Sequence, residues 1–247
     1  MFTSVTKLLK KISFWALPIG YLVLSAKAQA EEKTFQDPKV QLQGRYSFTA
    51  PASGSKRGLL VFFHGSGGAA SYAQNYAQIS SIADRWQLQV LSLQTPGMAL
   101  SWAEDGAGGK KFATYVKDLL DEAIFRPYPQ LDRKRTAFVG VSAGSTFVMG
   151  DFLPQFGSEF AGGAVFLCGG GFPMLAGRPN IGQMSQNFRM HAIIQAGDFL
   201  FMQTQGGLAF WQSQGLKASL ETLPGTGHCN FDFAAALERG LREIMPK

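Results

Sequence analysis

Short apolar runs and longer amphipathic stretches alternate along most of the chain. The apolar runs are expected to be strands buried on both faces of a sheet: 58–63, 88–93, 136–141, 164–168, 190–196 and 216–223. The stretches with helical spacing are expected to be helices: 72–86, 110–125, 143–153 (ending before Pro154), 203–214 and 231–245. A weaker alternation over 40–49, after a polar stretch, predicts an edge strand. This order predicts an α/β fold with a mostly parallel central sheet and helices on both faces.

The first thirty residues have the pattern of a secretory signal peptide. Lysines precede an apolar run over 12–25, and the small residues Ala26, Ala28 and Ala30 provide cleavage sites. The run is shorter than the roughly 20 apolar residues that a membrane span needs. Residues 1–30 therefore predict export to the periplasm or the medium, with an uncleaved N-terminal anchor as the alternative. Residues 31–247 are then expected to form a single domain, which touches a membrane only through this signal.

Composition and charge narrow the class of protein further. Hydrophobic residues make up 46% of the chain and charged residues 16%, which is typical of a globular protein. The formal net charge is +6, but residues 1–30 hold four lysines and no acidic residue, so the remainder carries only +2. No basic stripe remains, and nucleic acid is therefore not an expected partner.

The strongest chemical motif is Gly140-Val141-Ser142-Ala143-Gly144, placed between an expected strand and an expected helix. In that context, small flanking residues permit a sharp strained turn that exposes the serine hydroxyl above the sheet. An ordinary strand-to-helix turn is the alternative. The motif predicts that Ser142 is a nucleophile.

A serine nucleophile needs a base, and the chain has three histidines. His64 belongs to an upstream glycine-rich turn, and His191 begins an expected buried strand, where a structural role is expected. His228 lies in the loop after the last expected strand and can reach the edge of the sheet that carries Ser142. We therefore predict that His228 is the base, with a polar loop histidine as the alternative.

The acid that orients the base should follow a strand between the serine and the histidine. Between Phe160 and Leu220 the one carboxylate is Asp198, directly after an apolar run. Asp198 is predicted to hold the imidazole in the useful tautomer and stabilise its charged form. A simple turn residue beside Gly197 is the alternative.

Two backbone N–H groups should stabilise the developing oxyanion. Ala143, next after the nucleophile, is expected to give one. The other is expected from Ser66 or Gly67 in the loop after the first buried strand, where glycine lets the backbone approach a substrate. That loop lacks the Lys-Ser/Thr ending of a phosphate-binding Walker motif, and neither a cofactor nor a metal is expected.

At this point the chain resembles the α/β-hydrolase superfamily, in which serine, acid and histidine follow the chain order seen here. The segments His64-Gly-Ser-Gly-Gly68, Gly140–Gly144 and Cys168-Gly-Gly-Gly171 look like esterases related to polyhydroxybutyrate depolymerases and feruloyl esterases. The resemblance implies a serine carboxylesterase. In many relatives the acid stands where this chain has Leu200. The segment around Trp102 also lacks the aromatic-rich motif of polyester depolymerases.

The two cysteines and several aromatic side chains lie near the expected site. Cys168 and Cys229 could form a disulfide in an exported protein, although the strands they follow should be about two spacings apart; otherwise they are small apolar fillers. Trp102, Phe172, Phe199 and Phe231, with Phe201, could line a substrate pocket, or simply pack in the core.

Together these features predict a serine hydrolase that cleaves small or medium carboxylic esters through an acyl-enzyme. A thioesterase or a peptidase shares the acyl chemistry and is the alternative within the class of enzymes. A catalytically silent relative that binds small molecules is the alternative outside it. The sequence does not determine the oligomeric state.

Overall fold

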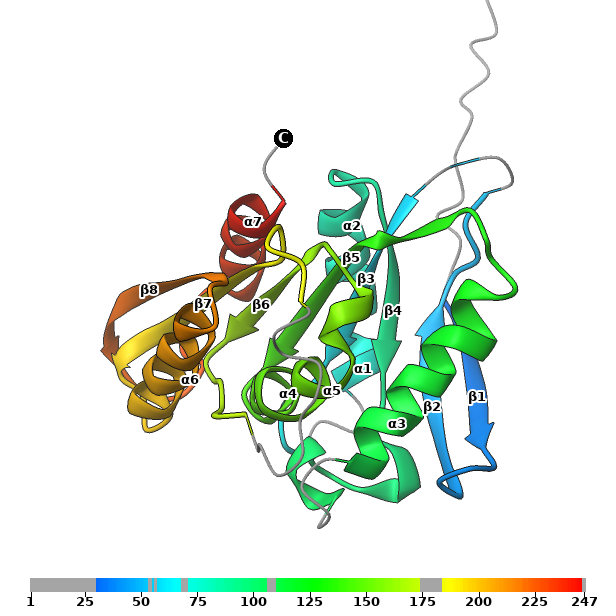
Figure 1. The fold of residues 1–247 in the computed structure, drawn as a ribbon, viewed down its shortest axis with the longest axis horizontal. Coiled ribbons are helices and arrows are strands. Elements are labelled where there is room, and N and C mark those ends of the chain that lie inside the picture. Colours follow the sequence, from blue (N-terminus) through cyan, green and yellow to red (C-terminus); the bar gives the residue numbers. More distant parts are fainter. Residues whose placement is uncertain are drawn as a thin grey trace, which may run out of the picture.

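An eight-stranded sheet with the strand order β1-β2-β4-β3-β5-β6-β7-β8 forms the centre of the molecule (Figure 1). The computed structural model describes residues 30–52, 55, 57–67, 71–105, 110–173 and 184–245. The predicted signal peptide, apart from Ala30, lies outside these residues. Among them, no helix has both the length and the apolar character to cross a membrane.

Six of the strands form the parallel part of the sheet: β3 (Arg57–Phe63), β4 (Leu88–Leu93), β5 (Leu131–Val141), β6 (Gly163–Leu167), β7 (Arg189–Gly197) and β8 (Lys217–Thr226). The other two pair antiparallel at one edge: β1 (Glu31–Asp37) and β2 (Leu42–Phe48). The central strands β3 and β6 are almost entirely buried, and β5 is buried from Thr136 to Gly140, because helices cover both faces of the sheet there.

The helices divide between the two faces of the sheet (Figure 1). They are α1 (Ser71–Gln74), α2 (Tyr76–Asp84), α3 (Lys110–Leu119), α4 (Ala143–Phe147), α5 (Leu153–Phe156), α6 (Phe201–Ser213) and α7 (Phe233–Ile244). The apolar sides of α2 and α7 form one core cluster with the sheet, and those of α3, α4 and α6 form the other. The predicted α/β-hydrolase architecture, a mostly parallel sheet between two helical layers, is therefore confirmed.

Two details of the predicted elements are wrong. The polar stretch before residue 40 is the strand β1, so β1 rather than β2 is the edge of the sheet. The side chains of β1 are mostly exposed, so its sequence lacks the apolar alternation by which a strand is recognised. The helix after Ser142 does not stop before Pro154 but continues as a π-helical turn over Val148–Phe152 and then as α5. Pro154 lies in the first turn of α5, where the missing N–H costs little.

Candidate active site

The turn between β5 and α4 holds Ser142 in a strained backbone conformation. Its φ is 50° and its ψ is −114°, in a region that non-glycine residues seldom occupy. A Cβ on Gly140 would lie 2.5 Å from the backbone of Ser145, and a Cβ on Gly144 would lie 2.3 Å from the carbonyl oxygen of Phe63. Both glycines of the motif are thus required by close backbone contacts, and these contacts lift Ser142 above the carboxyl ends of the strands.

A continuous chain of hydrogen bonds joins the three predicted catalytic residues. The Ser142 Oγ lies 2.7 Å from His228 Nε2. The His228 Nδ1 lies 2.9 Å from Asp198 Oδ2 and 3.1 Å from Asp198 Oδ1. Because the carboxylate accepts from Nδ1–H, the unprotonated Nε2 faces the serine hydroxyl. We call these three residues the candidate triad.

The two partners of Ser142 differ in how they are held. The side chain of Asp198 is fully buried at the end of β7, and its Oδ1 also accepts a hydrogen bond of 2.9 Å from the backbone N–H of Leu200. The side chain of His228 remains 29% exposed, on the loop between β8 and α7. The acid is therefore a fixed anchor, and the base can be reached by a substrate and by water.

The predicted oxyanion donors do not all remain available. The N–H of Gly67 donates to the carbonyl oxygen of Leu100 over 2.8 Å, so Gly67 is the wrong donor. Within the described residues the N–H of Ser66 has no such partner, and the same loop approaches Ser142 closely at Gly65. Ala143 begins α4, and an N–H in the first turn of a helix has no partner inside the helix. Ser66 and Ala143 therefore remain as the candidate donors.

His64 holds the loop that carries Ser66, a role that its place in a glycine-rich turn did not reveal. Its Nδ1 lies 2.6 Å from the carbonyl oxygen of Gly65, and its Nε2 accepts from the N–H of Thr95 over 3.2 Å. The ring is buried, and this burial lowers the pKa of His64. These bonds require the neutral Nδ1–H tautomer, so His64 serves as a brace and not as a second base.

Cys168 and Cys229 are joined in a disulfide, with their Cα atoms 5.1 Å apart. The strands that precede them are separated by β7, as expected, but the loops bend toward each other across its end. Cys168, Cys229 and His228 form a group whose potential ligand atoms lie within 4.8 Å of one another. With the two sulfurs bonded to each other, this group offers no thiolate for a metal ion.

The predicted pocket residues have different surroundings. Trp102 is buried in the core, where its indole stacks on Phe147 with ring centroids 4.9 Å apart, so its assignment to a pocket is wrong. Phe231 and Phe201 are half-buried, Phe231 against the core cluster of α2 and α7. Phe172 and Phe199 are exposed, and the Phe199 ring lies 4.6 Å from the ring of His228.

Two exposed apolar residues that the sequence did not single out lie on the same side of the molecule. Among the described residues, the large hydrophobic side chains left exposed are Leu100 (57%), Phe172 (54%), Phe199 (75%) and Met202 (71%). Leu100 bonds the loop of Ser66 and Gly67, and the other three follow β6 and β7 or begin α6. All four therefore lie at the carboxyl end of the sheet, around the candidate triad; we call them the apolar collar.

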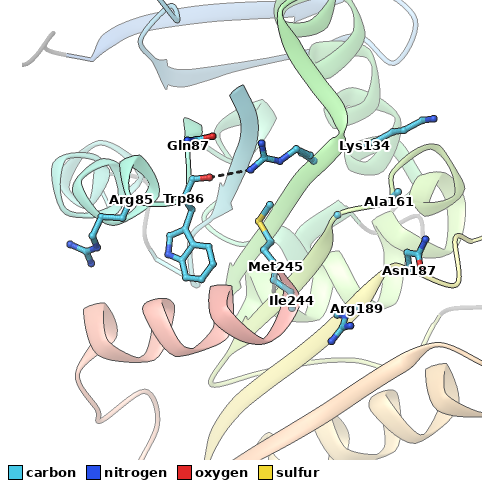
Figure 2. A pocket seen from close by; sticks show the side chains of 11 residues that line it. Arg85, Trp86, Gln87, Lys134, Ala161, Asn187, Arg189, Ile244 and Met245 are labelled. Atoms are coloured by element: carbon cyan, nitrogen blue, oxygen red, sulfur yellow. Dashed lines mark hydrogen bonds between the residues drawn. The ribbon is translucent and has the colours of Figure 1, made fainter. Parts of the chain in front are cut away.

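A cavity of about 640 Å³ lies at the opposite end of the sheet, where the parallel strands begin (Figure 2). Arg85 and Lys134 lie on opposite sides of it, with Ile244 and Met245 between them. Arg85 pairs with Glu238, while Arg135 donates to the carbonyl oxygen of Trp86, just after α2. The contact of Arg135 places a positive charge just beyond the C-terminus of α2, where a cation is favourable. None of the candidate catalytic residues lines this cavity.

Comparisons with known proteins support the fold. No protein-family model matches the sequence, and no curated protein matches it either. Among solved structures, a fluorophosphonate-binding serine hydrolase of Staphylococcus aureus matches with a TM-score of 0.65 and 16% identity, over 88% of this chain and 99% of the other. A ferulic acid esterase matches with a TM-score of 0.63 and 12% identity, over 86% and 96%.

A thermostable esterase is also similar, with a TM-score of 0.57 and 19% identity over 80% of this chain. The aligned part spans 55% of that esterase's length. At these identities the likeness establishes the α/β-hydrolase fold, and the candidate chemistry depends on the residues of this chain.

Proposed function

We propose that this α/β-hydrolase-fold protein hydrolyses carboxylic esters through an acyl-enzyme on Ser142. The observation that carries the proposal is the unbroken hydrogen-bond chain from Ser142 Oγ through His228 to the buried Asp198. Its serine occupies a strained turn directly before a helix, the arrangement that presents a nucleophile to a substrate. The solved structures with this fold include proteins described as an esterase and as a serine hydrolase, which agrees with the proposal.

In the first half of the reaction, Ser142 Oγ attacks the ester carbonyl carbon while His228 Nε2 takes the hydroxyl proton. Asp198 stabilises the imidazolium that forms and remains ionised itself. The tetrahedral intermediate collapses when His228 returns the proton to the departing alcohol oxygen, which leaves Ser142 acylated. A water molecule, deprotonated by His228, then attacks the acyl-enzyme, and His228 passes that proton to the departing Ser142 Oγ, which releases the acid and restores the serine.

The negative charge that develops on the carbonyl oxygen needs donors that are fixed before the reaction begins. The N–H groups of Ala143 and Ser66 are proposed for this role. The Ser66 side chain is itself held, because its Oγ lies 2.9 Å from Ser101 Oγ. With the brace from His64 behind it, the loop requires little rearrangement when the oxyanion forms.

The apolar collar supports an ester that carries apolar groups. Phe199 lies just before α6 and Met202 in its first turn, and the Phe172 ring covers Gly206, one turn further along the helix. They form a stripe that begins beside His228, and Leu100 lies near the proposed oxyanion loop. Exposed apolar patches of this kind commonly mark binding sites. We propose that the acyl or alcohol chain of the substrate lies along this stripe.

The test is hydrolysis of a chain-length series of p-nitrophenyl esters, with thioester and peptide substrates alongside. We expect ester hydrolysis that improves as the acyl chain lengthens, until the stripe is covered, and labelling of Ser142 by a fluorophosphonate probe. Phe199→Ala should flatten the chain-length preference while leaving labelling of Ser142 intact. Labelling without hydrolysis of any ester would move the proposal to thioesters or peptides. No labelling at all would favour a silent binding protein.

We also propose that the protein is exported, with residues 1–30 as its signal. The Cys168–Cys229 disulfide supports this location, since such bonds persist in oxidising compartments. Expression of the full chain in a bacterial host, followed by fractionation and N-terminal sequencing, should give a protein in the periplasm or medium that starts near Glu31. A protein with its N-terminus intact in the membrane fraction would indicate the uncleaved anchor instead.

A further inference from the structure

The loop that carries His228 begins directly after β8, which pairs with β7 as far as Thr226. Residues 227 and 228 are exposed, so burial in the core does not fix them. Gly225, Gly227 and Cys229 have φ values of 108°, 109° and 55°, which few residue types adopt without support. The side chain of Gln195 bonds the loop at its two ends, to Pro224 and to Asn230, with both bonds 3.3 Å long. The stretch between these bonds contains the base.

The other end of the disulfide belongs to the rigid part of the site. Cys168 is buried directly after β6, and its N–H donates to the carbonyl oxygen of Ile193 over 2.9 Å. The next residue, Gly169, packs against the backbone of Ser142 so closely that a Cβ there would lie 2.7 Å from the Ser142 carbonyl oxygen. The N–H of Ser142 in turn donates to Leu167. Cys168 thus shares one packed unit with the nucleophile.

From these contacts we infer that the Cys168–Cys229 disulfide is the positioning element that keeps His228 at Ser142. It links the residue next to the base to the packed unit of the nucleophile, across the end of β7 where Asp198 lies. This role makes the enzyme sensitive to thiol reductants. A dithiol supplies two electrons and two protons, is oxidised to its own disulfide, and leaves Cys168 and Cys229 as free thiols. The loop can then move His228 away from Ser142, while the sheet and its two cores remain.

The inference rests on the proposed function, and its first test uses ester hydrolysis. The oxidised full-length protein is compared with the same sample after reduction by a dithiol, with two free thiols verified by titration. We expect kcat to fall by about 10- to 100-fold, because a misplacement of about 1 Å can cost about 100-fold. The KM should change less than about twofold, since the residues of the apolar collar belong to other segments of the chain, and reoxidation should restore kcat.

The matched control is the Cys168→Ala/Cys229→Ala double variant, which should have the low kcat both with and without the reductant. Far-UV circular dichroism of all samples should be the same. An unchanged kcat after complete reduction would overturn the inference. So would loss of the circular dichroism signal on reduction, since the disulfide would then maintain the fold rather than position the base.

A second readout does not require any hydrolysis. The proton on His228 Nδ1, held by Asp198, should give a low-field NMR resonance in the oxidised protein that is missing in Asp198→Asn. We expect reduction to remove this resonance, and its persistence in the reduced protein would contradict the inference. A protein that hydrolyses no ester but loses the resonance on reduction would refute the proposed function and leave the positioning role intact.

Discussion

The chain contains a second cluster of serine, histidine and carboxylate. It differs from the candidate triad in its hydrogen bonds and in the backbone around its serine. His191, Ser219 and Glu221 lie on the adjacent strands β7 and β8; we call them the β7–β8 cluster. The His191 Nδ1 lies 2.8 Å from Ser219 Oγ, and its Nε2 lies 3.7 Å from Glu221 Oε2. The presence of the three residue types therefore does not distinguish a catalytic site from a structural one.

The hydrogen bonds around the histidine separate the two clusters. In the candidate triad the serine hydroxyl can donate to the base, because the other ring nitrogen donates to Asp198. In the β7–β8 cluster the carboxylate is too far away for a hydrogen bond, and the Ser219 hydroxyl faces the carbonyl oxygen of Met190 at 3.4 Å as well as His191. His191 therefore lacks the hydrogen-bonded carboxylate that orients and stabilises a catalytic histidine.

The backbone around each serine also differs. Ser142 lies in a strained turn with glycines on both sides and a helix behind it. Ser219 lies inside the strand β8, between Ala218 and Leu220. Ser219 has neither a glycine-flanked turn nor a helix N-terminus beside it, and these are the features that direct N–H groups at a substrate next to Ser142. This comparison supports placing the proposed chemistry at the carboxyl end of the sheet.

The largest difference is expected when each serine loses its hydroxyl. Ser142→Ala should reduce kcat on the preferred ester by about 10⁶-fold, the scale seen when a triad nucleophile is removed. Ser219→Ala is the matched control and should change kcat less than about twofold, because its hydroxyl serves only His191 and Met190. Steady-state kinetics of the two purified variants decide this. A large loss in Ser219→Ala with native circular dichroism would break the distinction between the clusters.

The next largest effect is expected at the carboxylates. Asp198→Asn should lower kcat by about 10⁴-fold, because the amide can donate to His228 and favours the wrong tautomer. Glu221→Gln should leave kcat nearly unchanged, since Glu221 pairs mainly with Arg239, at 3.0 Å. Equal activity in Asp198→Asn and the wild type would remove Asp198 from the candidate triad. Fluorophosphonate labelling rates provide the same comparison without a substrate.

Residues of this site that directly follow a strand could be predicted from the sequence, whereas those placed by contacts between loops could not. Ser142 and Asp198 were found because each directly follows an apolar strand, and the order of strands brings their ends together. The commitment of the Gly67 N–H to Leu100 could not be predicted, since it depends on how two loops meet. Trp102 was misplaced for the same reason, because loop aromatics can turn into the core or toward a substrate.

Some structural features leave no trace in local patterns. The edge strand β1 has an exposed, polar sequence and is fixed only by its pairing with β2. The disulfide depends on two loops that bend across β7, although spacing of the strands alone argued against it. The apolar collar was found in part: Phe199 is near the predicted acid, whereas Leu100 stands out only by its exposure.

The glycines of the serine motif give the third prediction. In Gly144→Ala the new Cβ would meet the carbonyl oxygen of Phe63 at 2.3 Å and push the turn of Ser142 away from β3. We expect a loss of about 1–3 kcal/mol in the free energy of unfolding, the usual cost of overpacking, and about a 100-fold loss in kcat. Ala218→Gly, beside Ser219, is the control and should leave kcat unchanged. Denaturant titrations and kinetics on both variants check this.

The smallest expected effect concerns the pH dependence of stability, where His191 acts through its burial. Burial lowers the pKa of His191 despite the nearby Glu221 and Glu243, so the unfolded chain binds this proton more readily than the folded one. Its contribution to stability is therefore complete above the unfolded value of about 6.5 and is lost as the pH falls toward the folded pKa. Burial also lowers the pKa of His64, so His64 makes a second contribution to stability with the same pH dependence.

Urea denaturation between pH 5.5 and 7.5 should show wild-type stability decreasing toward the acid side. His191→Asn keeps an N–H donor for Ser219 but cannot titrate, so its stability should fall less steeply, with the remainder due to His64. Its kcat at pH 7.5 should stay within about twofold of the wild type, because the β7–β8 cluster takes no part in the reaction. Equal slopes in the two proteins would mean that His191 binds its proton equally well in the folded and unfolded states, and burial would then not lower its pKa.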